Sequence, residues 1–155
     1  SVAYRRIAKN GLLHQLEAKF AYDEVESVYK RIDTALRYEI GGTMKRKIFK
    51  VLKLRLGKSF KVFHLDEKIT SKDYNEYPVD RKVSGLTSSI FSSLEFGLGK
   101  RLYVEIVANW SIMTVAFDRN YYDDPTRPAG LRNIGGTDFD FFNEKLLRIG
   151  LGFNL

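Results

Sequence analysis

Long stretches of strict two-residue alternation are the feature that most constrains how this chain folds. Segment 101–117 has Leu102, Val104, Ile106, Ala108, Trp110 and Ile112 on one side and Tyr103, Glu105, Val107, Asn109 and Ser111 on the other. Successive side chains of a β-strand point to opposite faces, whereas a helix repeats its apolar positions every three to four residues. The alternation therefore predicts antiparallel sheet with one apolar face and one polar face.

The same pattern recurs along the chain and predicts about eight strands. It is clear in segments 28–40, 89–99 and 147–155, looser in 12–22 and 47–57, and strand-like without assignable faces in 2–9 and 59–65. Polar or turn-forming residues separate these segments at Asn10-Gly11, 23–27, 41–46, Gly57-Lys58, 66–87, Gly99-Lys100 and 118–141. Asn-Gly and similar glycine-containing pairs are typical of β-hairpin turns. An all-β, up-and-down arrangement follows.

The lengths of these connections predict a barrel with two unlike ends. In an up-and-down barrel of eight strands, connections 66–87 and 118–141 fall at one end, and the other end carries only short turns. Outer-membrane barrels have this asymmetry, with short periplasmic turns and long external loops. The 155 residues amount to one domain, and no run of about 18 apolar residues predicts a membrane-spanning helix. We therefore expect residues 1–155 to form a single transmembrane β-barrel domain; whether further strands precede Ser1 is left open.

The polar face of the predicted strands carries charges of both signs. They are Glu17, Lys19, Arg31, Asp33, Arg37, Glu39, Lys53, Arg55, Glu95, Glu105 and Arg148, six basic and five acidic residues. An unpaired buried ion is costly, so this near-balanced set predicts an ion network inside a narrow barrel. Glycines at 97, 99, 150 and 152 on the same face would leave room for large side chains opposite. The competing interpretation is an ordinary solvated face.

The apolar face is predicted to contact lipid. Its residues include Ile90, Leu94, Phe96, Leu98, Val104, Ile106, Trp110, Leu147, Ile149, Leu151 and Phe153. The reverse orientation would give a soluble lipocalin-like barrel, in which Phe96, Trp110 and Leu151 line a cavity for a lipid-like ligand. Alternation alone does not choose between these two classes, and the balanced charges favour the membrane class.

Two segments resemble a known family. LEFGLGKRLYVEIVANWSI (94–112) and the closing LRIGLGFNL (147–155) are similar to strands of Gram-negative outer-membrane β-barrel proteins, in particular small eight-stranded barrels of the OmpA/OmpX type. The resemblance implies location in the bacterial outer membrane and assembly by its insertion machinery. The family commonly ends on Phe or Trp, whereas here Phe153 is followed by Asn154 and Leu155. The resemblance implies no particular activity, because one fold hosts many functions.

Basic residues exceed acidic ones, and the net charge of +7 favours phosphate-bearing partners. Lys45, Arg46 and Lys47 lie in a predicted external loop, where they either contact lipopolysaccharide phosphates or form a solvated turn. Nucleic acid is a disfavoured partner, because the positive charges are not gathered on one face with stacking aromatic residues. Loops 66–87 and 118–141 are expected to contact other envelope proteins.

No residue pattern predicts catalysis, a metal or a cofactor. His14 falls on the apolar face and His64 near the start of a long loop, and neither has metal-ligand spacing or a Ser-His-acid relay. Glu95 and Glu105 are expected to form ion pairs, with Arg148 on the adjoining strand, rather than an acid-base pair. The sequence thus predicts a non-enzymatic outer-membrane barrel that acts as a structural or accessory subunit of an envelope complex.

Overall fold

The computed structural model is all-β, with eight strands in one antiparallel sheet. It describes residues 1–25, 28–43, 52–70, 79–98, 101–123, 125–142 and 145–153, with the backbone alone at 145 and 146. The elements are β1 (Val2–Ile7), β2 (Leu12–Val25), β3 (Tyr29–Thr43), β4 (Leu52–Ile69), β5 (Asp80–Gly97), β6 (Leu102–Tyr121), the 3-10 helix η1 (Ala129–Leu131), β7 (Asn133–Phe141) and β8 (Lys145–Phe153). The predicted all-β, up-and-down sheet of eight strands is confirmed.

Consecutive strands pair from β1 to β7, and β8 returns to β6. β5 occupies one edge of β6 over nearly its whole length, so β7 and β8 both lie on the other edge. β7 pairs with residues 113–121 of β6, and β8 pairs with residues 102–110. Between them the backbone turns at Phe142, which has φ of 56°. β7 and β8 are therefore two parts of one interrupted strand, and the sheet has seven strand positions across its width.

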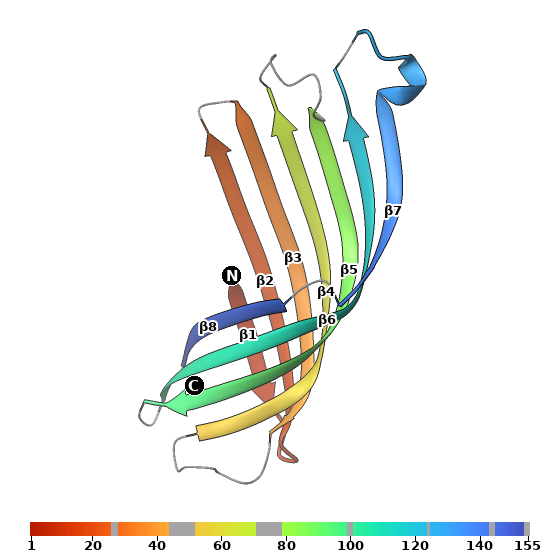
Figure 1. Cartoon of the computed structure of the whole chain (residues 1–155). Coiled ribbons are helices and arrows are strands. Elements are labelled where there is room, and N and C mark those ends of the chain that lie inside the picture. The colour runs from red at the N-terminus through yellow and green to blue at the C-terminus, as the bar shows by residue number, and fades with distance from the viewer. Residues whose placement is uncertain are drawn as a thin grey trace.

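The sheet curls into an incomplete barrel (Figure 1). We call the end with the β1–β2 turn, Ala8–Gly11, the lower end. In the lower half the sheet curls so far that β8 faces β1 and β2 on the concave side (Figure 1). In the upper half β2 to β7 form an open curved sheet. β1 pairs with β2 only as far as Ala18, so the upper part of β2 has β3 as its one neighbour in the sheet.

The strands are staggered at the lower end and level at the upper end. Leu12, the first residue of β2, aligns through β3, β4 and β5 with Ala108, which is six residues above the start of β6 at Leu102. With ~3.3 Å per residue and ~4.8 Å between strands, six residues over four strand spacings correspond to a tilt of about 45°. Closed barrels tilt their strands by a similar amount, ~35–45°. At the upper end, one cross-strand row contains Lys30, Lys68, Asp80, Tyr121 and Asn133.

One predicted turn is wrong, because Gly57-Lys58 lies inside β4. The predicted strands 47–57 and 59–65 are parts of this one strand, although residues 47–51 lie outside the described residues. Gly57 is there for close packing: a Cβ atom at this position would lie 2.5 Å from the Cα atom of Gly41 and 2.7 Å from the Phe91 ring. Glycine inside a strand often marks a site where another backbone or a ring approaches closely. By contrast, Asn10-Gly11 is a turn as predicted, with Gly11 at φ of 84°.

The two predicted long loops are largely strand. β4 continues to Ile69 and β5 begins at Asp80, so only the middle of 66–87 remains a connection. β6 continues to Tyr121, and β7 lies wholly within 118–141. The predicted number of strands is thus right for a different reason, because splitting β4 compensated for missing β7. The first half of the predicted connection 41–46 is also strand, because β3 continues to Thr43. Residues 44–46 and the predicted turn Gly99-Lys100 lie outside the described residues.

Candidate functional site: a charged interior and an apolar outer wall

The concave face of the sheet buries charged side chains, and the convex face exposes apolar ones. On the concave face Arg55 is 0% exposed, Glu39 2% and Glu95 3%, whereas on the convex face Ile149 is 73% exposed and Leu151 72%. A small apolar core of Leu13, Phe91 and Val107 lies on the concave face beside these charged groups. A water-soluble domain ordinarily buries apolar side chains and exposes ions. The side chains of this sheet do the reverse.

The first charged group of the interior is the Glu95 cluster, made of Arg5, Lys53, Arg55, Glu95 and Glu105. Glu95 and Glu105 are directly opposite each other on β5 and β6, and like charges in this position repel. Arg55 of β4 binds both carboxylates, with 3.1 Å between its Nη1 and Glu105 Oε1. Arg5 of β1 also binds both, with 3.1 Å to Glu95, and the Lys53 Nζ atom lies 2.8 Å from Glu95. The cations therefore hold together a carboxylate pair that would otherwise separate.

The second charged group is the Arg148 cluster, made of Glu17, Arg37, Glu39 and Arg148. Arg148 of β8 donates hydrogen bonds to Glu17 of β2 and Glu39 of β3, and Arg37 Nη1 lies 3.3 Å from Glu17. Arg148 thus crosses the interior from one edge of the sheet to the strands near the other edge. It was expected beside Glu95 and Glu105; Arg5 and Arg55 take that place instead.

The remaining residues of the expected ion network belong to neither cluster. Lys19 pairs with Asp33 at 2.6 Å in the upper half, where the Lys19 side chain is 49% exposed. Arg31 is exposed near the upper end of β3. Sequence reasoning missed Arg5, because Arg5 and Arg6 are adjacent in the segment whose faces could not be assigned. The pairing of β1 with β2 shows which residues of β1 face inward: Arg5 is opposite Gln15, which is buried on the concave face.

Aromatic rings lie over glycines on the concave face. A Cβ atom at Gly152 would lie 2.1 Å from the Tyr103 ring, and one at Gly41 would lie 2.8 Å from Phe91. The guanidinium of Arg5 lies 5.1 Å from the centre of the Tyr103 ring on the same face. At Gly150 the space for a Cβ atom is open. Gly152 of β8 therefore makes room for the Tyr103 ring, and Gly150 leaves open space on the concave side of the same strand.

Apolar side chains form continuous rows across the convex face. One row contains Val2, Ala18, Leu36, Val62, Leu86, Val115 and Phe139. The residues predicted to contact lipid, Ile90, Leu94, Phe96, Leu98, Val104, Ile106, Trp110, Leu147, Ile149, Leu151 and Phe153, are half-buried or exposed, and those within strands alternate with the concave set. We call this surface the apolar belt; on β6 it runs from Leu102 to Phe117.

Polar residues interrupt or bound the apolar belt at few places. Arg6, His14 and Lys58 share one outward row, and the His14 Nδ1 atom lies 2.7 Å from the Tyr38 hydroxyl. Above the belt, the outward row that contains Asp66, Lys82 and Arg119 is charged. The belt therefore has a charged upper boundary.

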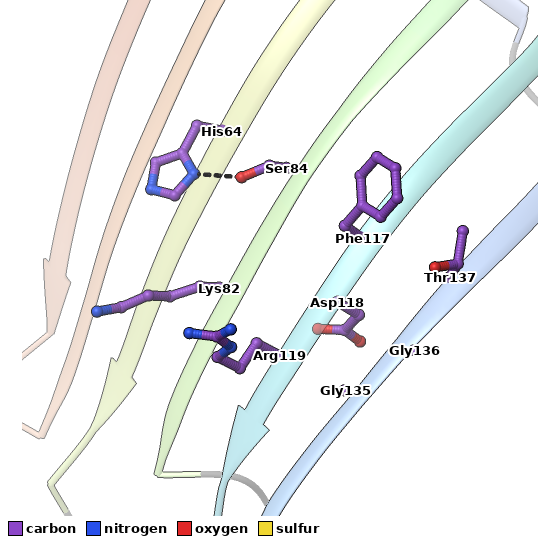
Figure 2. Close-up of a pocket in the computed structure, with 9 residues that line it drawn as sticks. All are labelled: His64, Lys82, Ser84, Phe117, Asp118, Arg119, Gly135, Gly136 and Thr137. Atoms are coloured by element: carbon purple, nitrogen blue, oxygen red, sulfur yellow. Dashed lines mark hydrogen bonds between the residues drawn. The ribbon is translucent and has the colours of Figure 1, made fainter.

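A pocket of about 520 Å³ lies at this boundary (Figure 2). It is lined by His64, Lys82, Ser84, Phe117, Asp118, Arg119, Gly135, Gly136 and Thr137. The His64 Nδ1 atom lies 2.8 Å from the Ser84 hydroxyl, and Lys82 stands directly opposite Arg119 in the β5–β6 register. The Asp118 carboxylate pairs with Arg81, and Asp80 is 3.8 Å from Lys82. Among the described residues no carboxylate lies within 4 Å of Arg119. Lys82 and Arg119 are thus adjacent cations, and like charges directly opposite each other repel.

Interactions at the upper end are solvated. Arg81 pairs with Asp118 at 3.5 Å and with Glu67 at 3.9 Å, and its side chain is 43% exposed. The Tyr29 hydroxyl donates a hydrogen bond to Glu67 at 2.6 Å, and this bond raises the pKa of Tyr29. Exposed ion pairs of this kind contribute only ~0–1 kcal/mol.

Catalytic and metal-binding arrangements are not found in the described part of the chain. No group of three His, Asp or Glu side chains is placed to hold a metal ion there. His64 and Ser84 are paired, but no carboxylate within 4 Å completes a relay among the described residues. No helix in the same residues is long and apolar enough to cross a membrane. Lys45, Arg46 and Lys47 lie outside the described residues.

Comparison with protein-family models, curated proteins and solved structures finds no match for this chain.

Proposed function

We propose that this chain forms the wall of a non-enzymatic β-barrel inserted in a membrane, the bacterial outer membrane, and serves as a structural or accessory subunit of an envelope complex. The inverted burial of the two faces carries this proposal. Soluble monomers rarely expose contiguous apolar patches larger than a few hundred Å². In a bilayer the same surface is stabilised by contact with hydrocarbon, and the ions are kept from lipid by lying inside.

The height of the apolar belt supports the proposal. On β6, the belt from Leu102 to Phe117 is about 50 Å long at ~3.3 Å per residue, and a tilt of ~45° reduces this to about 35 Å. On β4, the stretch from Leu52 to Val62 corresponds by the same conversion to about 23 Å. A bilayer has a hydrocarbon core of ~30 Å, and outer-membrane barrels have an apolar band of ~25 Å. The belt therefore matches the thickness that a membrane requires.

The two ends of the sheet support an orientation. The upper end carries the two longest connections, 70–79 and 122–132, and the short connection 26–28, whereas the lower end carries the turn Ala8–Gly11 and the connections 44–51 and 98–101. In outer-membrane barrels the longer connections are external. We therefore assign the upper end to the outside, and the upper parts of 66–87 and 118–141 to contacts with other envelope proteins.

Lipid phosphate is the partner that best fits the boundary pocket. Lys82 and Arg119 lie immediately above the apolar belt, and Phe117 is the last apolar outward residue of β6 beneath them. A phosphate between the two cations would relieve their repulsion, while acyl chains lie along the belt. In the external leaflet this partner is lipopolysaccharide.

The alternative function is a soluble carrier of a lipid-like ligand. It needs an apolar cavity lined by Phe96, Trp110 and Leu151, and these residues are 37%, 41% and 72% exposed on the convex face. The concave face carries the Glu95 and Arg148 clusters instead. This distribution favours the membrane proposal.

Partition between water and lipid tests the membrane proposal. Purified protein refolded with phosphatidylcholine vesicles should float with them in a density gradient and should resist extraction by carbonate at high pH, which removes peripheral proteins. The expected result is flotation and retention. A protein that stays monodisperse in buffer without detergent and does not float would overturn the proposal.

A pair of charge variants tests the phosphate contact separately. Binding of the protein is measured in three arms. The first uses phosphatidylcholine vesicles that contain lipid A, the second uses phosphatidylcholine vesicles that contain phosphatidylglycerol, and the third uses inorganic phosphate alone. Replacing Lys82 and Arg119 together by Gln should weaken binding of lipid A at least fivefold. Lys58→Gln, which removes an outward cation away from the pocket, is the matched control and should change little. Equal losses in the double variant and the control would reject the pocket as a lipid site.

A further inference from the structure

The two edge strands of the curled sheet run in the same direction. Every pairing from β1 to β6 is antiparallel, and β7 and β8 are both antiparallel to β6. With seven strand positions, the first and the last therefore point the same way. β1 and β8 both run toward the lower end, so a direct contact between them would be a parallel pair in an otherwise antiparallel sheet.

The same two strands are too far apart to pair directly. No Cα atom of β1 lies within 8 Å of a Cα atom of β8. Neighbouring strands lie ~4.8 Å apart, so two strands with one strand position between them are separated by ~9.6 Å. Side chains still reach from each edge strand to the strand beside the other edge, because Arg5 of β1 binds Glu105 of β6 and Arg148 of β8 binds Glu17 of β2.

The crossing side chains limit how the two edges align. Arg148 binds Glu17, which is paired with Ala3, and Glu39, whose cross-strand row contains Arg5, so Arg148 lies between the heights of Ala3 and Arg5. Gly150 is paired with Glu105, the partner of Arg5, so it lies near the height of Arg5. The order from top to bottom is the same on both strands, which agrees with their common direction.

We propose that the gap between β1 and β8 accepts one further β-strand, supplied by polypeptide outside residues 1–155, which runs opposite to both edges and completes an antiparallel barrel. The open edges provide the backbone hydrogen bonds, as in strand addition. The inward side chains of the added strand must be small, because Arg5 and Arg148 cross beneath it. Its outward side chains are apolar, because Tyr4 and Ile149 flank the gap on the convex face.

Two other ways to close the sheet fit the geometry less well. Direct pairing of β1 with β8 would require the edges to move together by several ångströms and would displace the crossing arginines. A second copy of the chain in the same membrane orientation brings its β8 to β1 with the same parallel direction. One added strand satisfies both the direction and the width of the gap.

Cysteine pairs test the width of the gap, since the chain has no native cysteine. Tyr4→Cys and Ile149→Cys place one thiol on each edge, on the convex face. A disulfide needs Cα atoms within ~7 Å, so oxidation should leave the two thiols free while a longer bismaleimide links them. Rapid and complete disulfide formation would mean direct pairing and would overturn the proposal.

A synthetic peptide tests the occupant. The probe has about nine residues that alternate Leu and Ala between terminal lysines, with a photo-reactive group, and the control has the same composition with its leucines grouped. The alternating probe should crosslink to both β1 and β8 and should slow hydrogen exchange of their amides at least tenfold, and the control should do neither. No crosslink to either edge, or edge protection in a species of twice the mass without peptide, would overturn the proposal. The assay needs only the folded sheet, so its outcome is independent of the membrane proposal.

Discussion

Strands β2 to β6 run through both halves of this sheet, yet the buried charged residues of the described part of the chain, Glu39, Arg55, Glu95 and Glu105, all lie in the lower half. In the lower half Arg55 is 0% exposed between Glu95 and Glu105. In the upper half every residue of β7 is exposed, and so are residues 19–25 of β2. β2 to β6 are continuous and paired in both halves, so their pairing does not explain the difference.

Curvature explains the difference. In the lower half the strands are staggered and the curl brings both edges near enough for Arg5 and Arg148 to reach the opposite strands. In the upper half the sheet stays open, and ion pairs such as Lys19 with Asp33 remain solvated. The comparison teaches that alternation decides which side chains share a face, and that closure of the sheet decides whether that face is an interior.

The largest effect is expected from removing the central cation of the lower half. Arg55→Met leaves Glu95 and Glu105 opposed and buried with fewer partners, which should destabilise the protein by ~3–5 kcal/mol. Urea unfolding in detergent micelles, followed by fluorescence, measures the change. The matched variant in the upper half is Arg81→Met, which removes an exposed arginine and should cost less than ~1 kcal/mol. Equal losses of stability in the two variants would mean that the lower and upper halves do not differ in how they bury charge.

A smaller effect is expected from Glu105→Leu. This change leaves Arg5 and Arg55 each with one carboxylate partner fewer, and Glu95 still balances part of their charge. A loss of about 2–3 kcal/mol is expected in the same unfolding assay. Combining it with Arg55→Met sharpens the comparison, because the double variant should lose less than the sum of the single losses. Additive losses would contradict a coupled cluster.

The smallest effect is expected at the solvated pair of the upper half. Lys19→Ala removes the partner of Asp33, but the Lys19 side chain is 49% exposed. The expected loss is about 0.5 kcal/mol or less, and it should vanish in high salt because screening weakens exposed pairs. A loss above ~1 kcal/mol that does not change with salt would mean that this pair is buried, and it would contradict an open upper half.

Alternation was sufficient to predict the faces of the long strands but not their full length. The outward residues of β6 follow the pattern from Leu102 to Trp110, and a β-bulge at Ile112 then shifts it by one residue. Higher up, Lys82 and Arg119 replace apolar residues above the belt, so the upper strand segments had no apolar period to detect. Gly57 looked like a turn because its role is visible only with Phe91 placed above it.

The members of the ion clusters were largely predictable, and their partners were not. Eight of the nine cluster residues follow from the polar face, and Arg5 is the exception. Which cation meets which carboxylate depends on the register and the curl, since Arg148 and Glu17 are 131 residues apart in sequence. Such long-range contacts leave no local signal.

The orientation of the two faces is the central claim, and adjacent residues of β4 test it most directly. In a Trp110→Phe background, Trp110 being the only tryptophan, Val62→Trp places the indole on the convex face and Phe63→Trp on the concave face at nearly the same height. In vesicles of brominated phosphatidylcholine, the account predicts strong quenching of the tryptophan at 62 and little quenching at 63. The reverse order, or no quenching at either position, would contradict it.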